Sequence, residues 1–390
     1  IKVPVVGGWM ESGAKGLLKY EPDVSITVAS IYLGKEVRFI DKGRLSYILI
    51  PKDSRHLANH FCTICKKIEP DLIHIHGTEY PHSFAAVIGC NIDRKVVSIQ
   101  GLVSVYADFY FGGLSFLKRI PTLRDVLRRD WLWIQKRKMK KRGKLEIKCI
   151  ENIRHIIGRT SWDRSHAWAI NPKAKYHFCN ETLRPQFYQK SWTYSSCEKF
   201  TIFLTQAYYP IKGFSQFLKA LPLVKRQFPN VKVFVGGIDF IHVSFIRKNG
   251  FTKYIERLIM ELGLTKNIVF LGKLNADEMV AQYQKAHIFV SPSAIENSPN
   301  SIGESQLIGT PCISSYVGGT MDMILDGKTG YLYRFEETNL LAYRICQLFQ
   351  DPELCRQISN NEKIAARGRH DPENNAKELF SIYESIIKNG

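Results

Sequence analysis

The chain lacks three features that would place it in a class at once. It has no run of about 18 apolar residues, so the sequence holds no candidate for a transmembrane helix. It shows no signal-peptide pattern. Its nine cysteines are scattered and odd in number, which argues against a disulfide framework and favours a reducing, cytoplasmic setting. We therefore expect neither a membrane-spanning protein nor a disulfide-rich secreted domain.

The chain has fewer acidic than basic residues. The chain has 55 Lys and Arg against 36 Asp and Glu, a formal charge of +19, which favours a phosphate-bearing ligand, a lipid headgroup surface or nucleic acid as partner. The excess peaks in segment 118–148, with thirteen basic and three acidic residues. There Leu123, Leu127, Trp131 and Ile134 follow helical spacing. A basic amphipathic helix suits an anionic membrane surface, but a solvated helix whose apolar face packs on its own domain fits equally well. Because no helix-turn-helix, zinc or RNP signature accompanies the charge, we expect no nucleic-acid partner.

The length and the alternation of patterns predict two α/β domains. A chain of 390 residues exceeds the usual size of a single core. Helical patterns such as 214–228 and 253–262 separate short apolar runs that are typical of buried parallel strands. These runs are 25–29, 72–75, 96–99, 201–204, 232–235, 268–271, 288–290 and 312–314.

The pattern breaks once, between about residues 180 and 200, and we place the domain junction there. We expect a first domain over 1–180, which includes the basic segment 118–148, and a linker over 181–199. A second domain is expected over 200–369. The last segment, 370–390, is predicted to form a helix.

The stretch 289–311 holds the densest set of candidate site residues. A strand is followed by a loop in which Ser298 can cap a helix that has Pro299 at its first position, and Gly309 can end that helix in a left-handed conformation. The start of this helix then lies at the carboxyl end of a parallel strand, where α/β sheets bind ligands and free N–H groups attract phosphate.

Two carboxylates flank this predicted helix start. Glu296 lies in the loop and Glu304 lies about one and a half turns into the helix. Both can accept hydrogen bonds from hydroxyl groups, one on each side of a phosphate site. A ligand with a diphosphate between two hydroxyl-bearing groups, such as a nucleotide sugar, fits this layout.

At this point the sequence resembles a known family. Glu296 and Glu304 match the E-x7-E motif of the GT-B glycosyltransferases of family 4, also called glycosyl transferases group 1. The turn Pro210-Ile-Lys-Gly213 is similar to the phosphate-binding Lys-Gly turn of that family, and the runs 309–315 and 326–330 are similar to its continuation. The resemblance covers residues 200–330 well and the first half more loosely.

The resemblance implies a GT-B fold of class α/β, in which two Rossmann-like domains with parallel sheets face a central cleft. It also implies that the C-terminal helix, in 370–390, crosses back to the first domain. It implies a retaining transfer in which Glu296 contacts the donor sugar, Glu304 holds the ribose and Lys212 stabilises the leaving diphosphate. It implies no cofactor beyond the nucleotide diphosphate sugar as co-substrate, and no metal, in keeping with the lack of an Asp-x-Asp motif. The donor-binding residues it implies are Gly7, Gly8, Gln206, Lys212, Gly213, Lys273, Leu274, Glu296, Ser298, Pro299, Asn300, Ser301 and Glu304.

Two positions depart from the pattern of the family. Gln206 stands where members often carry an arginine, so one cation is missing, and Arg159 is our candidate to replace it. Gln100 stands where many members have a histidine, so no general base lies there, which fits a mechanism in which the leaving phosphate takes the proton of the acceptor. We assign Glu296, Lys212 and Gln100 to catalysis, and His76, Gln100 and Arg159 to the acceptor side.

The start of the chain is unusual for this family. Gly7 and Gly8 resemble its glycine-rich loop, which normally follows a first strand. Only residues 1–6 precede them, and Pro4 argues against a central strand there. We therefore expect this strand to be missing.

The sequence thus predicts a glycosyltransferase that works in the cytoplasm, at the inner face of the cell membrane. Its donor is expected to be a UDP- or GDP-sugar, and its acceptor a glycan or lipid-linked glycan of a bacterial capsule or lipopolysaccharide. Two alternatives stay open. One is a non-catalytic basic protein that binds membranes or polyanions on a transferase scaffold. The other is a nucleotide-sugar epimerase, which Gln100 disfavours because it can neither take nor give a proton.

Overall fold

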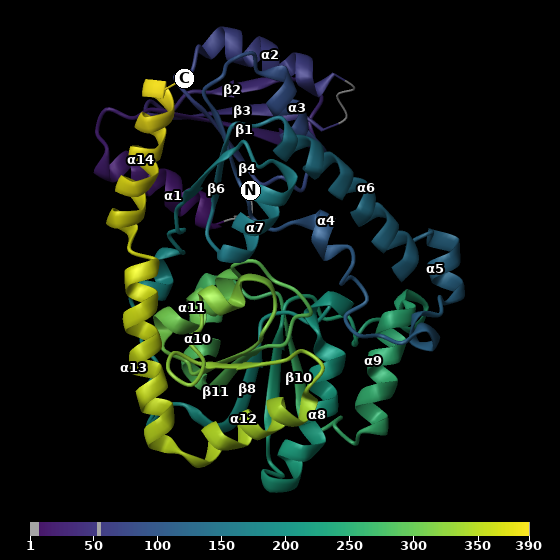
Figure 1. Ribbon diagram of the computed structural model, residues 1–390. Helices are drawn as coiled ribbons and strands as arrows, with labels where there is room; N and C mark the ends of the chain where they lie inside the picture. Colours follow the sequence, from purple (N-terminus) through teal and green to yellow (C-terminus); the bar gives the residue numbers. More distant parts are fainter. Residues whose placement is uncertain (1–7, 53–55, 390) are drawn as a thin grey trace. The chain divides into compact units, whose positions relative to one another are not determined.

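The computed structural model describes residues 8–52 and 56–389, which divide into two compact units (Figure 1). The larger unit comprises residues 103–141 and 184–369, and the smaller unit comprises the remaining described residues. The sequence suggested that the basic segment belongs to the first domain, but its part up to residue 141 packs with the larger unit. The region expected as first strand, residues 1–6, lies outside the described residues.

The larger unit contains one six-stranded parallel sheet, in the order β10-β9-β8-β11-β12-β13. Its central strand β11 is buried along its whole length, as its apolar sequence predicts. The strands are β8 (Glu198–Leu204), β9 (Lys232–Gly236), β10 (Ile268–Gly272), β11 (Ala286–Ser291), β12 (Cys312–Ser315) and β13 (Tyr331–Tyr333).

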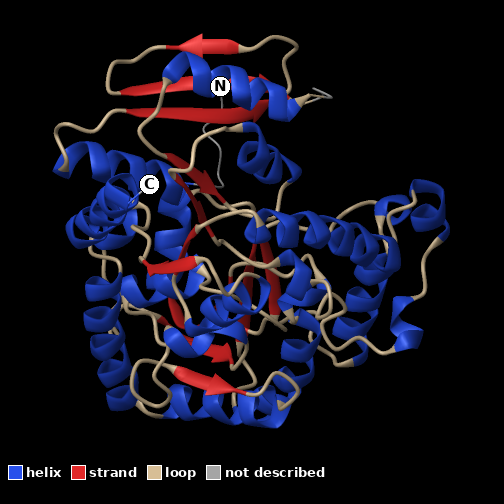
Figure 2. Cartoon of the chain, turned by 45° about the horizontal axis from the view of Figure 1, so that its top comes forward, coloured by secondary structure: helices blue, strands red, loops and turns tan. Residues whose placement is uncertain are grey.

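Helices cover the strands of this sheet (Figure 2). Helix α8 packs on α12, and α11 packs on α13. The long helices are α8 (Phe214–Gln227), α9 (Gly250–Glu261), α10 (Ala276–Lys285), α11 (Asn300–Ile308), α12 (Thr338–Gln350) and α13 (Pro352–Arg369). Segment 103–141 adds α4 (Val103–Tyr106), η1 (Phe116–Arg119), α5 (Leu123–Arg128) and the first half of α6 (Leu132–Glu151). The other short turns of 3-10 helix in this unit are η2 (Pro185–Tyr188), η3 (Pro210–Lys212), η4 (Phe245–Arg247) and η5 (Gly318–Asp322).

The smaller unit holds two sheets in its described part. Four parallel strands follow the order β4-β5-β6-β7, and a second sheet has the order β1-β3-β2, in which only β2 is antiparallel. Helix α14 packs on the four-stranded sheet through Ile382 and Ile386, which contact Val96 and Ile157 in one apolar core. The strands are β1 (Ile26–Tyr32), β2 (Arg38–Ile40), β3 (Leu45–Pro51), β4 (Ile73–His76), β5 (Lys95–Ser98), β6 (His155–Gly158) and β7 (Lys175–Phe178). The helices are α1 (Gly8–Tyr20), α2 (Leu57–Ile68), α3 (Pro81–Gly89), α7 (Ser161–Ile170), α14 (Pro372–Asn389) and the second half of α6.

The basic segment is not one helix, so the helical spacing read from Leu123 to Ile134 was misleading. Helix α5 ends because Arg129 adopts a left-handed conformation with φ of 51°, and its N–H caps the carbonyl of Asp125. A new helix, α6, begins at Leu132. Of the apolar side chains that we placed on a single face, Leu123 and Leu127 therefore lie in α5, Ile134 lies in α6 and Trp131 lies between the two helices.

In the part of the chain that the structure describes, no helix is long and apolar enough to cross a membrane.

Candidate active site

The candidate site lies at the carboxyl edge of the large sheet, where the turn after β8 meets the loop after β11. The turn ends in Lys212 and Gly213, and Gly213 has φ of 68°, which favours glycine. A Cβ atom on Gly213 would lie 1.7 Å from the carbonyl oxygen of Pro292. The N–H of Ala294 also donates to the carbonyl of Ile211 over 2.7 Å. Backbone packing therefore holds the basic turn directly against the loop that carries Glu296.

Lys212 and Glu296 form an ion pair across these two segments. The Nζ atom of Lys212 lies 2.6 Å from Oε1 of Glu296, and the hydroxyl of Ser293 donates to the same oxygen over 2.7 Å. The N–H of Gly319 holds the backbone of Glu296 through its carbonyl, at 3.0 Å. The Glu296 side chain is buried, while that of Lys212 is half-buried. The structure thus brings together a fixed carboxylate and a fixed cation that the sequence placed in one donor site.

Helix α11 starts beside this pair. Its first residues are Asn300 and Ser301, and Pro299 occupies the cap position, one residue later than the Ser298 cap that we predicted. The shift arises because Pro299 has the extended conformation of a cap (φ −70°, ψ 123°) and not the helical conformation of a first residue. The predicted left-handed end at Gly309 is confirmed, with φ of 85°.

Glu304 lies inside α11 and is paired with Arg184, a residue that the sequence analysis missed. The Nη2 and Nε atoms of Arg184 donate to Oε1 of Glu304 over 2.6 and 3.2 Å. Burial raises the pKa of the Glu304 carboxyl above its usual value, and the guanidinium acts against that rise. No spacing rule links two residues that are 120 positions apart, so only the fold reveals this pair.

We expect Arg184→Met to destabilise the protein in a pH-dependent way. Without the guanidinium, the pKa of Glu304 in the folded state rises further above its unfolded value. A carboxyl of this kind binds more protons when folded, so its contribution to stability is full at low pH and is lost as the pH rises through the folded-state pKa. The free energy of unfolding should fall by about 2 kcal/mol at about pH 8 and by clearly less at about pH 5.

Urea unfolding of the wild type and the variant at both pH values measures this difference. Arg184→Lys keeps the positive charge and serves as the matched control, with a smaller loss at the higher pH. An equal loss at both pH values in Arg184→Met would show that Arg184 acts through packing on Phe187, whose ring centroid lies 4.7 Å from the guanidinium, and not through Glu304.

Three further predicted donor residues follow strands of the same parallel sheet. Gln206 comes two residues after β8 and is half-buried, and Lys273 and Leu274 follow β10. Lys273 is exposed. A Cβ atom on Gly236, at the end of β9, would lie 3.5 Å from Leu274, so Leu274 approaches the same edge. Their contacts with a donor remain a prediction.

The glycine-rich start takes a different form. Gly7 lies outside the described residues. Gly8 is the first residue of helix α1 and belongs to the smaller unit. Gly8, which we expected in a loop, therefore lies in a helix.

The predicted acceptor-side residues follow adjacent strands of the smaller unit. His76 ends β4, Gln100 follows β5 and Arg159 follows β6. Arg159 is buried and forms an ion pair with Glu181, and the amide of Gln100 donates to Glu181 over 2.8 Å. A guanidinium N–H of Arg159 also donates to the side-chain oxygen of Gln100 over 3.2 Å. Glu181 thus balances the charge of Arg159 within this unit, and His76 is exposed.

Across the described ranges, no group of three or more His, Cys, Asp or Glu side chains is arranged to hold a metal ion. Metal independence stays a prediction.

The fold is that of the GT-B glycosyltransferases. Sucrose-phosphate synthase from Thermosynechococcus elongatus superimposes with a TM-score of 0.73 at 16% identity, over 98% of this chain and 93% of that one. The Anabaena protein HepE, solved with UDP-glucose, superimposes with a TM-score of 0.70 at 14% identity, over 99% and 97% of the two chains. Likeness at such low identity establishes the architecture of two Rossmann-like domains.

Part of the larger unit is similar in sequence to known glycosyltransferases. Residues 189–364 match the model of glycosyl transferases group 1. An uncharacterized glycosyltransferase of Methanocaldococcus jannaschii is 26% identical over 49% of this chain and 46% of its own length. A D-inositol 3-phosphate glycosyltransferase of Corynebacterium urealyticum is 31% identical over 34% of this chain and 31% of its own length. The capsular polysaccharide biosynthesis glycosyltransferase CapM of Staphylococcus aureus is 23% identical over 45% of this chain and 44% of its own length. The matched part therefore spans less than half of each relative.

Proposed function

We propose that the protein is a retaining glycosyltransferase that moves a sugar from a nucleotide diphosphate sugar to a hydroxyl group of a glycan. The observation that carries this proposal is the pair of Lys212 and Glu296, 2.6 Å apart beside the start of α11. A cation for a diphosphate and a carboxylate for sugar hydroxyls meet there, in a unit that matches glycosyl transferases group 1.

The chemistry follows from the charges of these groups. The bond between C1 of the sugar and the diphosphate oxygen breaks, and the electron pair goes to the leaving diphosphate. The acceptor oxygen bonds to C1 on the same face, and its proton passes to the leaving phosphate oxygen. Lys212 and the N–H groups at the start of α11 stabilise the negative charge that develops on the diphosphate. Glu296 accepts hydrogen bonds from sugar hydroxyls and orients the sugar.

Glu304 is proposed to hold the ribose through its hydroxyl groups. A carboxyl group has its full capacity to accept hydrogen bonds only when it is ionised. Burial works against the ionisation of Glu304 here. Arg184 supports the ionised form, because its guanidinium contacts Oε1 of Glu304. We propose Arg184 as the residue that positions Glu304 for the donor.

The acceptor is proposed to be a glycan or lipid-linked glycan of a bacterial surface polysaccharide, made in the cytoplasm. The similarity to CapM, a capsular polysaccharide biosynthesis glycosyltransferase, supports this class. On the smaller unit, His76, Gln100 and Arg159 are proposed as acceptor-side residues. Because Gln100 cannot take a proton, it can orient an acceptor hydroxyl but cannot act as its base.

Thermal unfolding in the presence of UDP, GDP, ADP, CMP and their sugars tests the proposal. A ligand at 100 times its dissociation constant adds about 2.7 kcal/mol of stability, which is readily seen. We expect a shift with one nucleoside diphosphate and its sugars, unchanged by EDTA. The HepE structure with UDP-glucose makes UDP the first nucleotide of the panel.

Glu304→Gln is the matched variant for this panel, because it keeps the shape of the side chain and removes its charge. It should keep the fold and lose most of the nucleotide shift. If the folded wild type shows no shift with any nucleotide, the chain is a non-catalytic protein on a transferase scaffold. A shift that EDTA abolishes would contradict a metal-independent site.

A further inference from the structure

The larger unit exposes an unusual number of large apolar side chains in one place. In η1 and α5, Phe116, Leu117, Leu123 and Leu127 are each at least 70% exposed. A second exposed group lies in η4, just before α9. We call these residues the exposed apolar patch: Phe116, Leu117, Ile120, Leu123, Leu127, Phe245 and Ile246. Single exposed apolar residues are normal, but a cluster of seven marks an interaction surface.

Two contacts show that both segments of the patch flank the start of helix α9. The Nζ atom of Lys118, in η1, lies 5.4 Å from the ring centroid of Tyr254, and Nζ of Lys253 lies 3.9 Å from the ring centroid of Phe245. Tyr254 and Lys253 are neighbours in the first turns of α9. Segments far apart in the sequence therefore contribute to one surface region.

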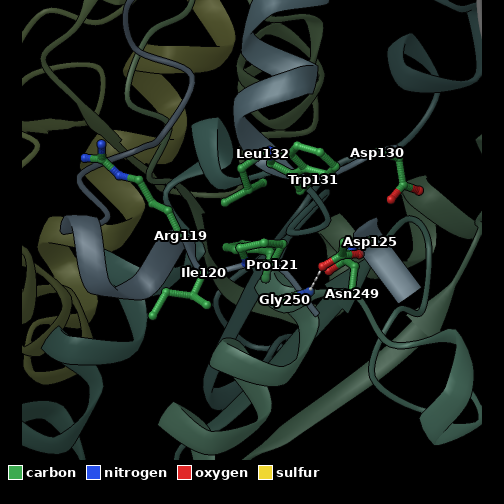
Figure 3. Close-up of a pocket in the computed structure, with 10 residues that line it drawn as sticks. Arg119, Ile120, Pro121, Asp125, Asp130, Trp131, Leu132, Asn249 and Gly250 are labelled. Atoms are coloured by element: carbon green, nitrogen blue, oxygen red, sulfur yellow. Dashed lines mark hydrogen bonds between the residues drawn. The ribbon is translucent and has the colours of Figure 1, made fainter. Parts of the chain in front are cut away.

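Asp125 fixes the patch in place. Its buried carboxylate accepts hydrogen bonds from the N–H groups of Thr122 and Gly250, over 2.9 and 2.8 Å, as Figure 3 shows for Gly250. Its other oxygen accepts from Arg124 over 2.9 Å. The small cavity between these elements, of about 20 Å³, has room for little more than a water molecule. The exposed side chains thus stand on a well-anchored base and not on a loose loop.

The exposed charged residues of 116–141, the segment that carries most of the patch, are all basic. Among the acidic residues of 116–148, Asp125 and Glu146 are buried and Asp130 is paired with Arg124. One lysine, Lys140, pairs with Asp108, which is outside that range. The exposed basic residues of the same part of the larger unit are Lys118, Arg128, Arg129, Arg137, Lys138, Lys140 and Lys141, and Arg247 lies beside Phe245 and Ile246.

We propose that the exposed apolar patch inserts into an anionic lipid bilayer, with these basic side chains on the headgroups. Leucine and phenylalanine side chains that enter the acyl boundary leave water, and lysine and arginine side chains reach anionic headgroups. The charge complementarity favours a lipid surface over a protein partner, because the core of a protein interface is depleted of lysine and the basic excess here is broad. This binding does not depend on the proposed glycosyl transfer.

Vesicle co-sedimentation of the full chain tests the proposal. Binding is expected with phosphatidylcholine vesicles that contain phosphatidylglycerol, and it should be weaker with pure phosphatidylcholine and fall as salt rises. The double variant Leu123→Asn/Leu127→Asn should weaken binding to the anionic vesicles by at least about tenfold, because two exposed apolar side chains no longer leave water. Both positions are exposed, so the fold should tolerate the change.

Ile364→Asn is the matched control, since Ile364 is 73% exposed on α13 of the same unit and lies outside the patch. It should bind like the wild type. A second variant, Arg137→Gln/Lys138→Gln, should weaken binding to anionic vesicles and reduce the preference for them, while the apolar contribution stays. Equal binding by the leucine variant and the wild type, or no binding of the folded wild type to anionic vesicles, would overturn the proposal; the second result would leave a protein partner as the occupant.

Discussion

Replacing Lys212 by alanine is expected to lower turnover by about 100-fold, as for the loss of one group that stabilises charge in a transition state. The cation matters most when negative charge grows on the leaving diphosphate, so kcat should fall more than KM rises. The measurement is the release of nucleoside diphosphate from the donor that the thermal-shift panel identifies.

Two further variants separate chemistry from folding. Lys266→Ala removes one exposed lysine from the same unit and should leave turnover unchanged. Lys212→Arg keeps a positive charge and should restore part of the lost rate. Because Lys212 also neutralises Glu296, the unfolding free energy of each variant is needed beside its rate. Near-normal turnover in a folded Lys212→Ala protein would remove this lysine from the catalytic machinery.

The ion pair of Lys212 with Glu296 leads to a prediction about whether the effects of two substitutions add. Two groups that are 2.6 Å apart act as a unit, so the effects of Lys212→Ala and Glu296→Ala should not add. The double variant is expected to be little worse than the more severe single variant. Additive effects would mean that the carboxylate and the cation contact different parts of the donor independently.

Many strands of both units could be predicted from local patterns in the sequence. All eight apolar runs that we interpreted as strands are strands. The runs 201–204 and 288–290 are buried at every residue, and a strand buried on both faces has to be continuously apolar. The turn 210–213 and the loop 292–299 could be placed on one edge of the sheet, because parallel strands all end on the same side. Because both segments lie on this edge, the sequence was enough to place Lys212 near Glu296.

Other features depend on contacts that no local pattern records. Arg184 contacts Glu304, which is 120 positions further along the chain. The sequence that follows Arg184 forms a short 3-10 turn that begins at Pro185, and it gives no sign of this contact. Arg129 takes a left-handed conformation without being glycine, so the helical spacing through Leu127 and Trp131 gave no sign of a break. Such a conformation is retained because its surroundings support it, here by hydrogen bonds from Arg129 N–H to the preceding turn. The pattern of apolar residues could not distinguish one amphipathic helix from two.

The largest effect on stability is expected from Gly213→Ala. At φ of 68° an alanine pays the cost of a left-handed conformation, and its Cβ would stand 1.7 Å from the carbonyl oxygen of Pro292. That oxygen belongs to the backbone of the Glu296 loop and cannot swing away as a side chain would. Strain and overpacking together should lower the free energy of unfolding by about 4 kcal/mol.

Gly263→Ala isolates the conformational part of this cost. Gly263 has φ of 64°, close to that of Gly213, but a Cβ atom there would meet nothing within 4 Å. Its alanine variant should lose only about 1–2 kcal/mol, so the difference between the two variants measures the contact with Pro292. Urea unfolding gives both values. Equal losses in the two variants would show that the Lys212 turn can move away from the Glu296 loop at little cost, and the fixed spacing of the cation and the carboxylate would then need a bound donor to establish it.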